Sequence, residues 1–130
     1  MSMSVRNITV DCADPYALAL WWCEVFEVPP SPDDHPGDPE ASCRLGAGQP
    51  RLLFEKVPEA KRAKNRVHVD LQPVRPRDEE VVRLVQLGAT VVADHRQTEE
   101  AGWVVLADPE GNEFCLNLSA EERTRAVASS

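Results

Sequence analysis

The chain has 130 residues, of which 42% are hydrophobic and 28% are charged, and its net charge is −8. This length suits a single domain with one hydrophobic core. The acidic balance argues against a nucleic-acid or anionic-membrane surface, because clustered positive charge supplies most of the affinity of such surfaces. No segment approaches the roughly 20 apolar residues that a membrane-spanning helix needs.

The N-terminal segment and the cysteines indicate the compartment. The first ten residues lack the basic patch, apolar run and cleavage site of a secretory signal. The four cysteines are widely spaced and form no C-x-x-C pair, so reduced thiols are expected. We therefore predict a cytoplasmic protein, and the charge balance and the lack of a long apolar segment predict no nucleic-acid or membrane partner.

The first half of the chain predicts a strand, a helix and further strands. Residues 5–12 alternate apolar and polar side chains, which is typical of a half-buried strand. Asp14 and Pro15 are helix-start signals, and apolar residues at helical spacing predict a helix over 16–27 with a buried face. A proline-rich loop is expected at 28–38, followed by strands at 41–45 and 51–57.

The second half repeats that order after a polar connector at 58–65. Residues 66–72 alternate again, and the acidic residues 78–80 predict the start of a helix that stops at Gly88. Strands are expected at 89–94, 102–107 and 113–118. A turn joins the last two, with Gly111 free to take a positive φ. The final segment, AEERTRAVASS, is a polar helix or a frayed tail.

The two halves have matching patterns. When residues 7–11 are aligned with residues 68–72, apolar side chains match apolar ones and polar side chains match polar ones. This match favours an α+β fold made of two similar units packed together.

Three stretches carry a resemblance to a known superfamily. They are VDCADPYALALWWCEVF, NRVHVDLQP, and LGATVV followed by GWVVLADPEGNEFCL. Together they resemble the vicinal oxygen chelate superfamily, the glyoxalase / bleomycin-resistance / dioxygenase group, and especially its glyoxalase-like branch. The similarity spans residues 5–118.

The resemblance implies two βαβββ modules with curved mixed sheets around a shared cleft, often in a homodimer. A single glyoxalase-like domain would cover residues 1–125, with module one at about 4–58, module two at about 65–119 and a tail at 126–130. Members of the superfamily include lyases, isomerases, metal-dependent dioxygenases, thiol transferases and metal-free drug-sequestering proteins.

Candidate site residues follow from strand geometry. Each strand has one apolar face that covers a helix, so its polar face points toward the space that the curved sheets enclose. Polar groups on one concave face suit a small-molecule site. The predicted ligand-binding residues are Asn7, Thr9, Asp11, Glu55, Gln72, Trp103, Cys115 and Asn117, and the predicted catalytic residues are His68 and Asp70.

Metal-using members of the superfamily place one ligand on each of four strands. The matching positions here are Asn7, Glu55, His68 and Cys115, where the family has two imidazoles and two carboxylates. A neutral amide is a poor ligand for a transition metal, and a thiolate favours zinc or softer ions. The resemblance thus implies His68, Glu55 and Cys115 as candidate ligands for a divalent metal (zinc, iron, nickel or manganese).

The roles of several residues stay open at this point. His68 is either a half-buried strand histidine hydrogen-bonded to Asp70, or an acid–base group that Asp70 orients. Apart from the metal role that the resemblance implies, Cys115 is either an inert core or cavity residue or a reactive thiolate, which would need a cationic neighbour. Trp103 belongs either to the core or to the rim of the site, where it would stack on a planar ligand.

Four functions are compatible with these features. The leading hypothesis is a glyoxalase-like small-molecule-binding protein, an enzyme whose reaction the sequence does not define. The rivals are a metal-dependent lyase or dioxygenase, a non-enzymatic antibiotic-sequestering resistance protein, and a partner domain that kept the fold without the chemistry. An acidic surface would suit capture of a cationic drug.

Overall fold

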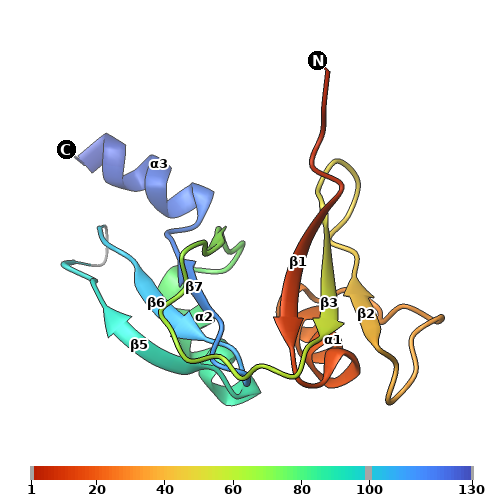
Figure 1. The fold of residues 1–130 in the computed structure, drawn as a ribbon. Helices are drawn as coiled ribbons and strands as arrows, with labels where there is room; N and C mark the ends of the chain where they lie inside the picture. The colour runs from red at the N-terminus through yellow and green to blue at the C-terminus, as the bar shows by residue number, and fades with distance from the viewer. Residues whose placement is uncertain (1, 99–100, 130) are drawn as a thin grey trace. The chain divides into compact units, whose positions relative to one another are not determined.

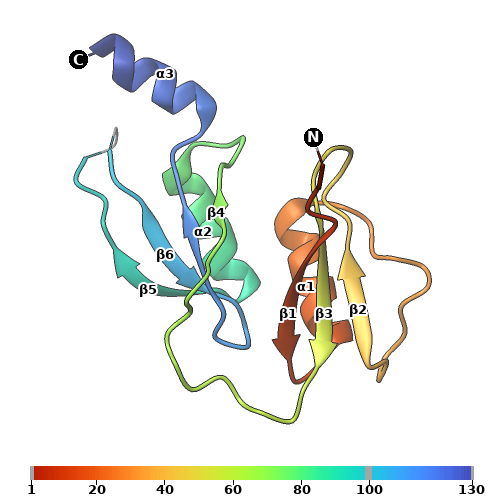
Figure 2. The same cartoon turned by 45° about the horizontal axis from the view of Figure 1, so that its top comes forward.

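The computed structural model describes residues 2–98 and 101–129. The chain divides into two compact units, Met1–Arg62 and Ala63–Ser130, and the boundary falls inside the predicted connector. Each unit contains one mixed β-sheet, as Figures 1 and 2 show in two views. The predicted α+β fold class is confirmed.

Unit 1 is a three-stranded sheet with one helix. Its elements in chain order are β1 (Asn7–Cys12), α1 (Pro15–Phe26), β2 (Glu40–Cys43) and β3 (Arg51–Lys56). β3 lies in the centre, parallel to β1 and antiparallel to β2. α1 contacts β2 and β3 and covers one face of this sheet. The core of the unit is therefore the layer between the helix and that face.

The start of α1 matches the sequence prediction. The Asp14 carboxylate accepts a hydrogen bond from the backbone N–H of Ala17 at 3.2 Å, and Pro15 occupies the first turn. This arrangement satisfies one of the free N–H groups at the helix start, and proline has no N–H to satisfy there. Trp21 and Trp22 are buried, as expected for the apolar face of the helix.

The proline-rich loop between α1 and β2 runs beside the sheet without forming a strand. Proline cannot donate to a β-ladder, so the described part of unit 1 has three strands where a βαβββ module has four. The Asp34 carboxylate in this loop accepts a hydrogen bond from the N–H of Ser42 on β2, at 2.9 Å. The loop therefore covers a backbone donor on the edge strand.

Unit 2 has a four-stranded sheet and two helices. Its elements are β4 (Asp70–Leu71), α2 (Arg77–Leu87), β5 (Thr90–Asp94), β6 (Val104–Ala107), β7 (Glu113–Leu116) and α3 (Ala120–Ser129). The strand order is β4-β7-β6-β5, with β4 parallel to β7 and the other pairs antiparallel. In both units the first strand runs parallel to the last, which agrees with the repeat seen in the sequence.

β4 is much shorter than the strand predicted at 66–72. At the two ends of its ladder with β7, the carbonyl of Val69 accepts from the N–H of Cys115, and the carbonyl of Leu71 accepts from the N–H of Asn117. The residues of β4 that this ladder pairs are Asp70 and Leu71 alone. Val67 is 79% exposed, so the alternation of apolar residues continues beyond the paired backbone. The predicted length was wrong because a side-chain pattern does not report where the neighbouring strand ends.

α2 and α3 are tied together at their N-termini. The Ser119 hydroxyl accepts from the N–H of Glu122 at 3.1 Å, and the Glu122 carboxylate accepts from the N–H of Ser119 at 3.0 Å. This reciprocal pair is a capping box, and it makes the terminal segment a helix. The same carboxylate oxygen accepts from the N–H of Arg77 at 2.7 Å. One glutamate therefore caps two helices.

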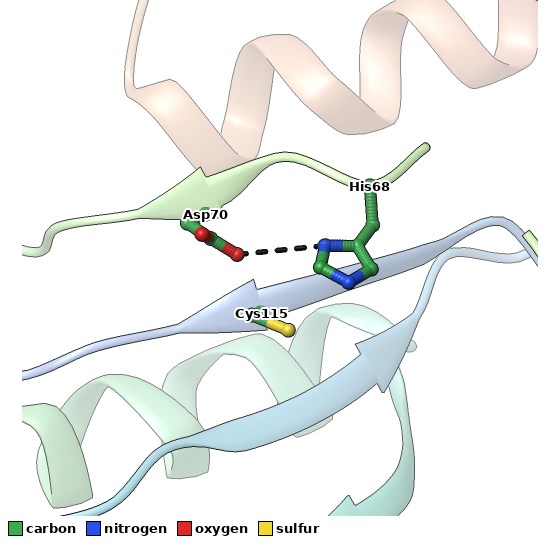
Figure 3. Close-up of side chains that lie close together, drawn as sticks. All are labelled: His68, Asp70 and Cys115. Atoms are coloured by element: carbon green, nitrogen blue, oxygen red, sulfur yellow. Dashed lines mark ion pairs between the residues drawn. The ribbon is translucent and has the colours of Figure 1, made fainter. Parts of the chain in front are cut away.

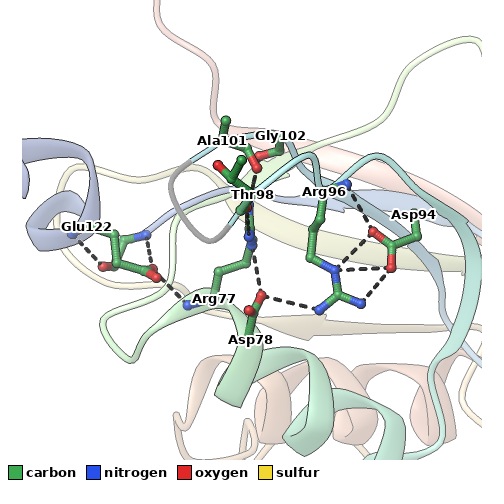
Figure 4. A network of polar contacts seen from close by, with 9 residues as sticks. Arg77, Asp78, Asp94, Arg96, Thr98, Ala101, Gly102 and Glu122 are labelled. Carbon is green, nitrogen blue, oxygen red and sulfur yellow. Dashed lines mark hydrogen bonds and ion pairs between the residues drawn. The ribbon is translucent and has the colours of Figure 1, made fainter. Parts of the chain in front are cut away.

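Arg77 is buried to 1% exposure and anchors the loop before β6. Its guanidinium donates to the carbonyls of Thr98, Ala101 and Gly102 at 2.8–3.1 Å and to the carboxylate of Asp78 at 3.1 Å. Figure 4 shows this side chain leaving the start of α2 toward those carbonyls. A buried charge is tolerated when it is paired and hydrogen-bonded, and this one meets both conditions.

In the described ranges 2–98 and 101–129, the helices are too short or too polar to span a bilayer.

Candidate metal centre and ligand-binding face

Three side chains of unit 2 gather at one point of its sheet. His68, Asp70 and Cys115 each offer one potential ligand atom, and these atoms all lie within 4.8 Å of one another. The His68 Nδ1 lies 3.5 Å from the Asp70 Oδ1. Figure 3 shows the imidazole reaching toward the carboxylate, with the thiol of the neighbouring strand beside them. The cluster contains one nitrogen, one oxygen and one sulfur donor.

Strand register brings these residues together. β4 and β7 pair with Asp70 opposite Cys115, so the two side chains share one face of the sheet. His68 precedes Asp70 by two residues and lies on the same side of the chain. The opposite face carries Phe114 and Leu116, which are buried in the core. The polar face predicted from alternation is the face on which the cluster lies.

The three side chains differ in their exposure to water. Cys115 is 5% exposed, whereas the side chains of His68 and Asp70 are 42% and 58% exposed. Burial raises the pKa of the Cys115 thiol, and the nearby Asp70 carboxylate raises it further. Without a cation the thiol therefore stays protonated at neutral pH, and it is not a free nucleophile.

The donor set fits a divalent metal. Imidazole, carboxylate and thiolate are the ligand types that zinc uses, and three protein ligands with an open fourth position are the arrangement of catalytic zinc sites. In the absence of a cation, the nearby Asp70 carboxylate raises the pKa of the Cys115 thiol. A bound cation would offset the charge of Asp70 and favour the deprotonated form of Cys115. His68 and Cys115 were predicted as ligands. Asp70, predicted to orient the imidazole, offers the third donor.

The predicted site residues of unit 1 lie on one face of its sheet. Cross-strand pairing places Asn7 opposite Arg51, Thr9 opposite Leu53 and Asp11 opposite Glu55, on the face away from the buried Leu52 and Phe54. Asn7 accepts a hydrogen bond from the Arg51 Nε at 3.1 Å. A role of Glu55 as a metal ligand stays a prediction, as does the convergence of the two polar faces on one cleft.

The other predicted residues of unit 2 have different surroundings. Gln72 follows β4 and is exposed, and Asn117 follows β7 and bonds through its backbone to Leu71. Trp103 lies just before β6 and stacks on His95, with ring centroids 4.7 Å apart. It is 43% exposed, so it does not belong to the core.

Sequence reasoning singled out no arginine, but three arginines stand close to the predicted face of unit 1. Arg6, Arg44 and Arg51 line one pocket together with Asn7. A signal existed for Arg51, because period-2 alternation places it on the same face as Leu53 and Glu55. Arg6 and Arg44 lie outside the strands, where alternation gives no information.

A family model for the glyoxalase-like domain matches residues 7–117. The chain therefore belongs to the glyoxalase-like domain family, and so to the glyoxalase / bleomycin-resistance / dioxygenase superfamily. No curated protein matches the sequence.

Solved structures of that superfamily share the fold at low sequence identity. A glyoxalase/bleomycin resistance protein/dioxygenase family enzyme from Burkholderia phytofirmans is 20% identical with a TM-score of 0.63, covering 85% of this chain and 94% of its own. A possible glyoxalase from Bacillus cereus is 20% identical with a TM-score of 0.63, covering 88% of this chain and 98% of its own.

A third structure is a mutant of the fosfomycin resistance protein FosX from Listeria monocytogenes, in complex with Mn(II) and dihydroxypropylphosphonic acid. It is 17% identical to this chain with a TM-score of 0.66, over 96% of this chain and 98% of its own. At these identities the likeness concerns the fold alone.

Proposed function

We propose that this glyoxalase-like domain holds a divalent metal, with zinc favoured, at His68, Asp70 and Cys115, and that the metal binds a small organic molecule through an oxygen atom. The observation that carries the proposal is the placement of three different donor atoms within 4.8 Å of one another. Zinc is favoured because the set includes a thiol, and thiolate ligands select zinc over harder ions such as manganese.

Each residue has a distinct role in this site. The nearly buried Cys115 supplies a donor from the sheet itself, and the two exposed residues close the site from the solvent side. A metal held this way supplies Lewis-acid polarisation of a bound oxygen. The Asp70 carboxylate, 3.5 Å from the His68 Nδ1, also fixes the orientation of the imidazole. This supports an enzyme over a purely structural domain.

The rival function is metal-free capture of a cationic small molecule. The net charge of −8 favours it, because an acidic surface raises the local concentration of cations. Affinity would then fall steeply with added salt and would not depend on Cys115. Metal binding and ionic-strength dependence therefore separate the two functions.

The proposal also includes that the protein acts in the cytoplasm as a homodimer. Analytical sedimentation of the purified chain tests the dimer.

The test is metal analysis of the tag-free chain purified without chelator, followed by titration with zinc and with cobalt(II). We expect one metal per chain, and a thiolate-to-cobalt absorption band that reports Cys115. His68→Ala and Asp70→Asn change exposed side chains, so the fold should survive, and each should weaken metal binding about tenfold or more.

The matched control is His35→Ala, which removes an imidazole from a loop of unit 1 where it stands beside Asp38. It should bind metal as the parent chain does. Cys115→Ser is the direct test of the thiolate, with thermal unfolding measured in parallel because this residue is buried. Equal metal affinity in the parent chain and in all three cluster variants would overturn the proposal.

A further inference from the structure

Unit 1 contains a pocket of about 420 Å³ at the start of β1 and the loop between β2 and β3. Its lining includes the guanidinium-bearing residues Arg6, Arg44 and Arg51. The side-chain amides of Asn7 and Gln49 belong to the same lining, which among the described residues includes no carboxylate. This size is within the range of about 300–1,000 Å³ that small-molecule sites occupy.

The charge of this pocket is opposite to that of the unit around it. Residues 1–62 contain six Lys and Arg against ten Asp and Glu, and half of those basic residues line the pocket. Among the residues that the structure describes, no ion pair involves Arg6, Arg44 or Arg51. The Arg51 Nε donates to the Asn7 Oδ1 at 3.1 Å, a neutral acceptor. Three like charges without a counter-charge repel one another, so an anion between them is stabilised.

A second pocket adjoins the first and is mainly apolar. It has a volume of about 550 Å³ and shares Arg44 and Gly46 with the arginine pocket. Its remaining wall is the proline-rich loop, residues 28–33, with Val28 and three prolines, and with Asp33 as its single acid. A ligand whose anionic group occupies the first pocket can therefore lay an apolar body along the second.

We propose that unit 1 binds an organic phosphate, with the phosphate held by Arg6, Arg44 and Arg51 and the apolar part against the proline-rich loop. Guanidinium groups match phosphate oxygens with paired hydrogen bonds. Three cations suit a phosphate monoester, which carries a charge of about −2 at neutral pH, better than a carboxylate with a charge of about −1. The proposal goes beyond the metal centre, because none of the metal-site residues lines either pocket.

The test is titration of the full chain with n-hexyl phosphate at low ionic strength, followed by calorimetry and by amide chemical shifts. Inorganic phosphate and hexanoate serve as comparison ligands. We expect hexyl phosphate to bind tightest, because it alone combines the dianion with an apolar chain. Shifts should concentrate at residues 28–33 and 44–51. Equal affinity for hexanoate and hexyl phosphate would overturn the assignment to phosphate.

Substitutions separate a built site from general attraction. Arg6→Gln with Arg44→Gln changes two exposed side chains and should weaken hexyl phosphate binding about tenfold or more, since hydrogen bonds to charged groups contribute about 1.5–3 kcal/mol each. Lys56→Gln with Arg62→Gln removes the same charge elsewhere in unit 1 and should leave the affinity within about twofold. Equal losses in the two double variants would overturn the proposal.

His68→Ala distinguishes this site from the metal centre. It should bind hexyl phosphate with the parent affinity whether or not metal binding is lost, because His68 lines neither pocket. A loss of hexyl phosphate binding in His68→Ala would place the phosphate at the metal centre and refute an independent site in unit 1.

Discussion

At the scale of single residues, Gly102 occupies a position that no other residue can fill without strain. Its φ is +85°, and a Cβ built there would lie 2.0 Å from the carbonyl oxygen of His95. Gly102 belongs to the loop before β6, where the Arg77 guanidinium donates hydrogen bonds to the carbonyls of Ala101 and Gly102. The glycine is needed both for the backbone angle and for the space beside it.

Gly102→Ala should therefore destabilise unit 2 by more than the strain of a left-handed residue, which is about 1–2 kcal/mol. Gly37→Ala is the control, because Gly37 has a φ of +86° and a Cβ added there would meet no atom within 4 Å. Urea unfolding of both variants measures the difference. If the two substitutions lower the free energy of unfolding equally, the backbone contact at His95 has no energetic effect.

Arg77 illustrates the cost of removing a buried, fully bonded charge. Arg77→Met keeps much of the volume but leaves the carbonyls of Thr98, Ala101 and Gly102 without this donor. We expect a loss of about 3 kcal/mol in the free energy of unfolding. Arg123→Met, an exposed arginine on α3, should change it by less than about 0.5 kcal/mol. Similar urea midpoints for the two variants would contradict this account.

At the scale of elements, the two principal helices end differently. α2 ends at Gly88 with a φ of 114°, as the sequence predicts, whereas α1 ends at Glu27 with a φ of 55°. A left-handed backbone is strained in any residue with a Cβ, and glycine is the usual residue there. α1 therefore ends on an unfavourable residue.

Glu27→Gly should raise the free energy of unfolding by about 0.5–1 kcal/mol, because it removes the left-handed strain at the end of α1. Glu24→Gly, inside the same helix, should lower it by about 1 kcal/mol, because glycine is a poor helix former. Thermal unfolding of the two variants gives shifts of opposite sign if this is correct. A Glu27→Gly variant that is less stable than the parent chain would refute the prediction.

At the scale of the whole molecule, three carboxyl groups of unit 2 have lowered pKa values. Hydrogen bonds from Arg96 hold the pKa of Asp94 at about 2. Burial alone would raise the pKa of Asp78 and of Glu122, but hydrogen bonds outweigh this effect and lower both pKa values. Asp78 accepts these bonds from the side chains of Arg77 and Arg96. Glu122 accepts them from the backbone N–H groups of Ser119 and Arg77. Ordinary values are 3.8 for aspartate and 4.5 for glutamate.

These shifts predict acid unfolding that begins in unit 2. A lowered folded-state pKa contributes stability above the ordinary pKa and loses it as the pH falls toward the folded value. The stability of unit 2 should therefore fall between about pH 4.5 and pH 2, and faster than that of unit 1. Amide spectra across this range follow the two units separately. Loss of unit 1 signals before those of unit 2 would contradict the prediction.

The sequence predicted the order of elements, the fold class and the polar faces, because these depend on local periodicity, proline and capping residues. It also placed His68 and Cys115 in one site. It placed Asp70 in that site too, as the residue that orients His68, but did not predict it as a metal-ligand donor, since a donor set depends on side-chain positions across two strands. The capping box of Ser119 and Glu122 was present as a readable pattern, and it would have decided between a helix and a frayed tail.

The missing strand of unit 1 has a consequence for how copies of the chain behave at high concentration. An uncovered strand edge is a template on which a second molecule can add a strand and start a fibril. Here the Asp34 carboxylate occupies the outward N–H of Ser42, and a charged, proline-rich loop runs beside that edge. We expect that shortening this loop would expose the β2 edge to pairing with a strand of another molecule, so the loop guards this edge of the sheet against aggregation.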